Sequence, residues 1–81
     1  MRCVAQQAGP AGVRANCVVP ELIMTEHNEQ AIPDEIREQL VANHPLRRLG
    51  TVEDVAAMVA FLLSPAAGWT TGEAVGVTGG M

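Results

Sequence analysis

The chain has 81 residues, of which 48% are hydrophobic and 17% are charged, and its formal net charge is −4. This composition predicts an ordered chain, because disorder combines low hydrophobicity with high net charge. All five basic residues are scattered arginines and only 2% of residues are aromatic, which argues against a nucleic-acid surface. No stretch approaches the ~20 apolar residues of a membrane span. We expect a cytoplasmic protein that binds neither nucleic acid nor membrane, with Cys3 and Cys17 as buried thiols.

The first part of the chain predicts a helix end, a strand and a short helix. Residues 2–8 suit a helix end, since Gly9-Pro10 stops it. Residues 13–19 are rich in valine and bounded by Gly12 and Pro20, which predicts a buried strand. The stretch to Ile32 is irregular and polar. Pro33 suits the first position of a helix that ends near residue 43, with two carboxylates in its first turn.

The clearest element is a helix from Thr51 to Ser64. Thr51 is a good N-cap, acidic residues fill the first turn, and apolar residues recur at helical spacing until Ser64-Pro65. Residues 73–78 then alternate polar and apolar, and predict a second strand. Two strands joined through a helix imply a parallel pair with a crossover connection. The predicted class is therefore α/β, with a βαβ unit.

Four blocks of sequence, in order, resemble the C-terminal part of short-chain dehydrogenase/reductase enzymes. These enzymes have a Rossmann fold and use NAD(P) to oxidise alcohols or reduce carbonyl groups. The first three blocks are Gly12–Asn16, which resembles the family's Gly-Ile/Val-Arg-Val-Asn strand; Pro20–Thr25, which resembles Pro-Gly-x-Ile/Val-x-Thr; and Pro45–Ala56, which resembles Pro-Leu-Gly-Arg-x-Gly-x-Pro-Glu-Asp-Val-Ala. The fourth comprises Phe61–Ser64 and Thr71–Met81, which resemble the family's closing helix, turn, strand and terminal Gly-Gly. The resemblance implies the C-terminal βαβ portion of a Rossmann fold, incomplete as a domain.

The resemblance also implies a structural or binding role for each segment. Residues 1–25 would hold the helix end, the strand and the loop beside the nicotinamide. Within that loop, Pro20 and Leu22 would border the cofactor, the Ile23 backbone would meet the carboxamide, and the Thr25 hydroxyl would contact the carboxamide or the phosphates. Residues 26–48 would be a lid over the substrate, and residues 49–81 a helix and terminal strand at a subunit interface. The cofactor implied is NAD or NADP.

Departures from the family pattern are equally informative. The family's glycine after the proline is Glu21 here, where a positive φ would cost about 1 kcal/mol or more. A second glycine is replaced by Arg47, and the aspartate before the final Gly-Gly by Thr78. Nothing matches the family's Gly-rich phosphate turn, and the chain has no Tyr or Lys for its catalytic Tyr-x-x-x-Lys. We expect no catalytic residue and, at most, weak cofactor binding by this chain alone.

Some residues allow two interpretations. Thr25 suits a cofactor contact or a local cap of the lid helix. His27 and His44 could hold a metal ion, but their spacing fits no helical face, so structural or solvated histidines are favoured. Glu53 and Asp54 suit helix-dipole partners better than an acid/base pair.

Three hypotheses follow for the whole chain. It is a remnant of a reductase, a piece of a larger enzyme whose N-terminal half is its missing partner, or a free-standing module that forms homo-oligomers. The open edges of a two-stranded sheet support the third hypothesis.

Overall fold

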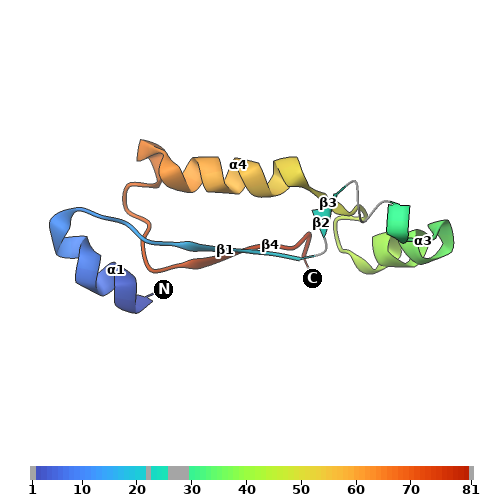
Figure 1. Ribbon diagram of the computed structural model, residues 1–81, viewed down its shortest axis with the longest axis horizontal. Coiled ribbons are helices and arrows are strands. Elements are labelled where there is room, and N and C mark those ends of the chain that lie inside the picture. The colour runs from blue at the N-terminus through green and yellow to red at the C-terminus, as the bar shows by residue number, and fades with distance from the viewer. Residues whose placement is uncertain (1, 22, 26–29, 81) are drawn as a thin grey trace.

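The computed structural model describes residues 2–21, 23–25 and 30–80, and the fold is α/β (Figure 1). In chain order the elements are α1 (Arg2–Ala8), the 3-10 turn η1 (Gly9–Ala11), β1 (Cys17–Pro20), β2 (Ile23–Met24), α3 (Asp34–Asn43), β3 (Gly50–Thr51), α4 (Val52–Leu63), the 3-10 turn η2 (Pro65–Ala67) and β4 (Ala74–Val77).

The centre of the fold is the parallel pair of β1 and β4. Cys17 lies opposite Ala74, and Pro20 lies opposite Val77. Helix α4 runs along this pair, and α1 and α3 lie at opposite ends of the molecule (Figure 1). Because β1 reaches β4 through α4, the βαβ unit expected from the sequence is confirmed.

A second, shorter pairing lies beyond the end of β1. Strand β2 pairs in parallel with β3, with Ile23 opposite Gly50 and Met24 opposite Thr51. The sequence did not indicate it, since two-residue strands have no periodicity of their own. This pairing brings the loop after β1 to the start of α4.

Helix α4 begins and ends at side chains that replace missing helical hydrogen bonds. At its N-terminus, the Thr51 hydroxyl accepts from the Asp54 amide at 3.2 Å, and the Asp54 carboxylate accepts from the Thr51 amide at 2.9 Å. This capping box confirms Thr51 as the N-cap. At its C-terminus, Arg14 donates to the carbonyls of Leu62 at 2.7 Å and Ser64 at 3.3 Å.

Several expected boundaries were wrong by a few residues. Strand β1 begins at Cys17, because residues 14–16 bond instead to the loop before β4; the Asn16 side chain, for example, accepts from the Glu73 amide at 3.1 Å. Val13 consequently lies outside the sheet and is 53% exposed. Pro33 is the N-cap of α3 and not its first residue.

The hydrophobic core is small and the molecule is elongated. The radius of gyration is 15.8 Å, whereas a compact domain of this length has roughly 12 Å. Among the described residues, the buried apolar side chains are those of Ala5, Met24, Leu62 and Ala67. Cys3 is exposed and Cys17 is half-buried, so the expected burial of both thiols was wrong. The short core leaves too little interior to cover them.

Helix α4 is apolar on more than one side. Val55, Met58 and Leu62 are half-buried or buried, whereas other apolar side chains of the helix are exposed, with Phe61 at 48% and Leu63 at 79%. A helix that is apolar all round is typical of the interior of a larger assembly. None of the described helices is long and apolar enough to cross a membrane.

Candidate functional site

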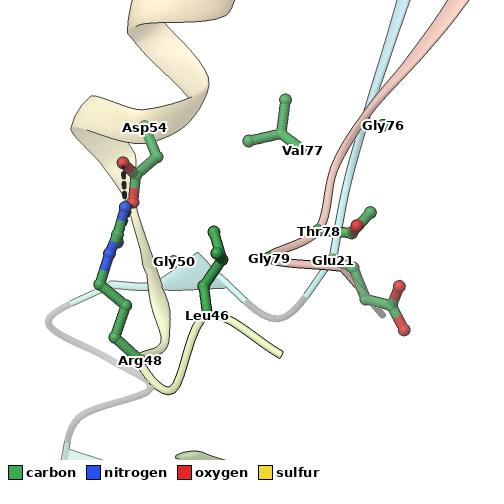
Figure 2. Close-up of a pocket in the computed structure, with 9 residues that line it drawn as sticks. All are labelled: Glu21, Leu46, Arg48, Gly50, Asp54, Gly76, Val77, Thr78 and Gly79. Carbon is green, nitrogen blue, oxygen red and sulfur yellow. Dashed lines mark hydrogen bonds and ion pairs between the residues drawn. The ribbon is translucent and has the colours of Figure 1, made fainter. Parts of the chain in front are cut away.

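A cavity of about 230 Å³ lies at the carboxyl ends of β1 and β4 (Figure 2). Its walls come from the ends of both strands, the loop before β3 and the first turn of α4. The lining residues are Glu21, Leu46, Arg48, Gly50, Asp54, Gly76, Val77, Thr78 and Gly79. Ligands of open parallel sheets bind outside the carboxyl ends of the strands, so topology favours this cavity as a binding site.

A second cavity of about 360 Å³ lies before the amino ends of the same strands and is lined in part by Gly12 and Trp69. It is larger, but it occupies the edge of the sheet that ligands of this architecture do not use. The indole of Trp69 is fully exposed beside it. We therefore assign the candidate site to the carboxyl edge.

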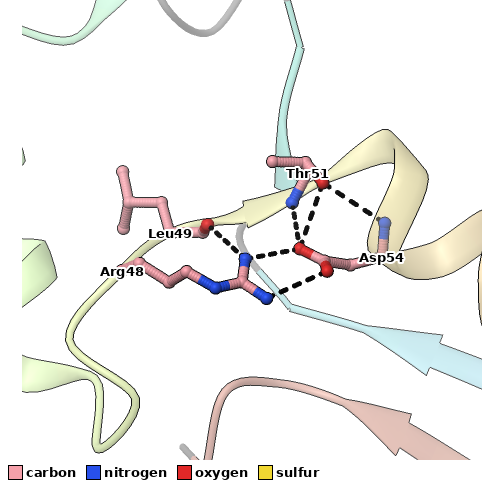
Figure 3. A network of polar contacts seen from close by, with 4 residues as sticks. All are labelled: Arg48, Leu49, Thr51 and Asp54. Carbon is pink, nitrogen blue, oxygen red and sulfur yellow. Dashed lines mark hydrogen bonds and ion pairs between the residues drawn. The ribbon is translucent and has the colours of Figure 1, made fainter.

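Arg48, Asp54 and Thr51 form a connected polar network on one side of the first cavity (Figure 3). The Arg48 guanidinium donates to both oxygens of Asp54, at 2.6 and 3.0 Å. The hydrogen bond from Arg48, followed by that from the Thr51 amide, holds the pKa of the Asp54 carboxyl well below its usual range. Asp54 therefore stays ionised and bound, which suits a structural role and not proton transfer.

Glu21 lies across the cavity from this ion pair (Figure 2). Its backbone does not adopt a positive φ, because its amide donates to the Val77 carbonyl at 3.2 Å and continues the ladder of β1 and β4. The strain expected where the family has glycine is therefore absent at Glu21. The left-handed backbone occurs instead at Arg47, with φ +56°. The Glu21 carboxylate adds negative charge to the rim of the cavity.

The expected cofactor-binding residues lie near this edge but do not line the cavity. Ile23 is half-buried in β2, and Thr25 is exposed directly after it. Pro20 ends β1 and is exposed. Leu22 lies outside the described residues. The short β2 strand thus places the Ile23 backbone beyond the carboxyl end of β1.

Sequence reasoning missed the ion pair of Arg48 and Asp54. Both residues lie in the block from Pro45 to Ala56, and their opposite charges beside an N-cap were a usable signal. Asp54 was assigned to the helix dipole alone, whereas the structure gives it the capping box and Arg48 as well.

The histidines give no metal centre in the part of the chain that the structure describes. No group of three potential metal-binding side chains occurs there. His44 is only 2% exposed, and its Nδ1 lies 2.6 Å from the Leu40 carbonyl. This is the structural histidine that was favoured above; His27 lies outside the described residues.

Comparison with known proteins identifies the family. The family model described as "Enoyl-(Acyl carrier protein) reductase" matches residues 1–81. An uncharacterized short-chain type dehydrogenase/reductase of Sinorhizobium fredii is 39% identical over 80 residues, which make up 99% of this chain and 32% of that protein. The chain belongs to the short-chain dehydrogenase/reductase family.

Other members of the short-chain dehydrogenase/reductase family agree in sequence and in structure. Acetoacetyl-CoA reductase of Synechocystis is 45% identical over 80 residues, covering 98% of this chain and 33% of the relative. A solved structure of 7 alpha-hydroxysteroid dehydrogenase, complexed with NADH and 7-oxo glycochenodeoxycholic acid, is 37% identical with a TM-score of 0.84, covering 98% of this chain and 31% of that one. The chain therefore spans about a third of the length of these relatives, and its fold is part of their Rossmann fold.

Proposed function

We propose that this chain forms the nicotinamide-side wall, lid and terminal strand of an NAD(P)-dependent oxidoreductase. The reaction would be hydride transfer between NAD(P) and a carbonyl or alcohol substrate. The observation that carries the proposal is the match to the family along the whole chain, together with a β2 strand that lies at the carboxyl edge of a parallel pair. This is the edge at which dinucleotides bind to open α/β sheets.

The described residues fit a nicotinamide on two points. An amide ligand requires paired backbone donors and acceptors, and the family pattern assigns this contact to the backbone at Ile23, which lies in β2. The Thr25 side chain is exposed directly after β2, and its hydroxyl both donates and accepts. Pro20 would border the ring; we assign Leu22 to the same wall on the family pattern. NAD(P) supplies the hydride when it is bound, and these residues hold and orient its carboxamide.

Proton transfer must come from outside this sequence. Carbonyl reduction requires an acid that protonates the substrate oxygen, which the family's Tyr provides with the help of its Lys. The chain contains neither residue, and Asp54 is committed to its ion pair with Arg48. We therefore propose that the 81-residue chain alone is catalytically silent, and that activity needs a partner segment with the Gly-rich turn and Tyr-x-x-x-Lys.

A turnover assay tests the silence of the chain. The purified chain is mixed with NADH or NADPH and a panel of ketones, and oxidation of the cofactor is followed. The expected rate equals that of a blank without protein. A rate that survives exhaustive purification and falls in a Thr25→Ala variant would contradict the proposal, since it would show a complete site within these 81 residues.

A second candidate function is a module that forms homo-oligomers, derived from the same fold. It is favoured by exposed apolar side chains of α4, among them Phe61 and Leu63, which are 48% and 79% exposed, and by the elongated shape. A pair of strands with two open edges is also poorly stable alone. Sedimentation equilibrium combined with an NMR titration of nicotinamide separates the two functions: a discrete assembly without affinity for nicotinamide favours the module, whereas nicotinamide binding at β2 favours the oxidoreductase segment.

A further inference from the structure

Helix α3 has no core of its own to hold it in place. None of its residues is buried, and it lies at one end of the molecule (Figure 1). The segment that follows it, residues 44–48, connects it to β3 and α4. His44 begins this segment and is tied to α3: its amide donates to the carbonyls of Leu40 and Val41, and its buried ring lies against Leu40.

Arg47 binds the carboxyl end of α3 with its side chain. Its Nη1 donates to the Ala42 carbonyl and to the His44 carbonyl, the latter at 3.2 Å. The last carbonyls of a helix have no partner within the helix, and the helix dipole favours a cation there. The Arg47 amide also donates to the His44 carbonyl, at 2.8 Å. Arg47 itself has a left-handed backbone, at φ +56°.

The neighbouring residues, Leu46 and Arg48, form hydrogen bonds with the residues just after β4 and with α4. Arg48 forms its two hydrogen bonds with Asp54 in the first turn of α4. The Leu46 amide donates to the Gly79 carbonyl at 3.1 Å, just past the end of β4. The segment is thus fixed to α4 and β4 through Arg48 and Leu46, and to α3 through Arg47 and His44.

We propose that Arg47 is a positioning residue that holds α3 in a fixed orientation relative to α4. This rests on the proposed function, in which α3 belongs to the lid over the carboxyl edge. The family pattern has glycine at this position. Glycine adopts a positive φ without strain but has no side chain to bind the end of α3. Arginine at this position has a strained backbone, but its guanidinium caps the carboxyl end of α3. The lid helix of this chain is therefore held by a contact that the family pattern lacks.

Four variants of the full chain test the proposal without any cofactor. Arg47→Gly keeps the backbone conformation and removes the guanidinium. Arg47→Gln removes the charge. Arg47→Lys keeps a cation that can reach the same carbonyls. Arg2→Gln, at an exposed position of α1, is the control for charge alone. Two quantities are measured by NMR: amide hydrogen exchange of residues 40–44 relative to that of α4, and residual dipolar couplings, which report the orientation of α3 against α4.

Arg47→Gly and Arg47→Gln are expected to speed exchange at residues 40–44 by about fivefold, the size of a cation's effect at a helix end. Both variants should also reduce the residual dipolar couplings of α3 while leaving those of α4 unchanged. Arg47→Lys and Arg2→Gln should remain within about twofold of the parent chain. Unchanged α3 signals in Arg47→Gly would overturn the proposal, as would an equal rise in exchange across α3 and α4, which would assign Arg47 to global stability. Because no nicotinamide is present, failure of the proposed function would leave these outcomes unaffected.

Discussion

Replacement of Arg14 should destabilise this chain more than its half-buried position suggests. Its guanidinium donates to the carbonyls of Leu62 and Ser64, at 2.7 and 3.3 Å, and reaches the Thr70 carbonyl at 3.5 Å. It therefore closes the C-terminus of α4 and holds the loop that leads to β4. In the family pattern this arginine belongs to the strand block, and no local pattern indicates partners that lie about fifty residues further along the chain.

The size of the effect follows from these contacts. Hydrogen bonds to a charged group contribute about 1.5–3 kcal/mol, and a cation at a helix C-terminus adds up to about 1 kcal/mol. We expect Arg14→Ala to lower the free energy of unfolding by about 2 kcal/mol, since part of the gain is lost to solvent. Arg14→Lys is the matched control. It keeps the cation, but one ammonium cannot reproduce two donors that diverge to separate carbonyls, so about half of the loss is expected.

Urea unfolding followed by far-ultraviolet circular dichroism measures both variants. All samples must be compared at one protein concentration, because association shifts the apparent stability. Hydrogen exchange at the end of α4 gives a local readout of the same contact. A change below about 0.5 kcal/mol in Arg14→Ala, the range of ordinary surface substitutions, would refute the assignment of Arg14 as the cap of α4.

Three further predictions concern α4 and its ends. Thr51→Ala should lower the free energy of unfolding in urea by about 1 kcal/mol, because it removes the hydroxyl of the capping box. Thr51→Ser keeps the hydroxyl and should leave this free energy nearly unchanged. Equal losses in the two variants would contradict a role of the hydroxyl. Because the pKa of Asp54 is depressed, its stabilising effect is present above the ordinary carboxyl pKa of about 4 and is lost as pH falls through the folded value. Asp54→Asn should therefore flatten the loss of stability in acid, and an NMR titration showing Asp54 at its ordinary pKa would refute this. Finally, Leu63→Arg should shift the chain to 8.5 kDa monomers in sedimentation equilibrium, with Arg2→Glu as a control on α1; a parent chain that is already a cooperatively folded monomer would contradict association.

Elements that depend on local chemistry could be predicted from the sequence. The N-cap at Thr51 and the stop at Ser64-Pro65 gave α4 correctly, because capping and the restrictions of proline act within one turn. The parallel pairing of β1 and β4 followed from the chain order alone. The lengths of the strands did not, because residues 14–16 find side-chain partners in the loop before β4 and leave the ladder.

Features that depend on distant contacts could not be predicted. The pairing of β2 with β3 is too short to leave a pattern. Glu21 lacks the positive φ because its amide continues the ladder of β1 and β4, whereas Arg47 adopts one. At the site, the resemblance placed the cofactor loop at the carboxyl edge of the sheet, whereas the Arg48–Asp54 network and the cavity beside it could be found only from the structure.

Titration of the isotope-labelled chain with reduced nicotinamide mononucleotide tests the central claim most directly. This ligand carries the nicotinamide without the adenosine half, whose phosphate-binding turn the chain lacks. We predict weak binding, with amide shifts gathered at Ile23, Met24 and Thr25 and reduced by Thr25→Ala. Shifts gathered around Trp69 at the opposite edge, or no shifts at millimolar ligand, would contradict the claim. So would dissociation constants for NAD(P) near 1 µM, about −8 kcal/mol, since such affinity requires the pyrophosphate site that this sequence does not contain.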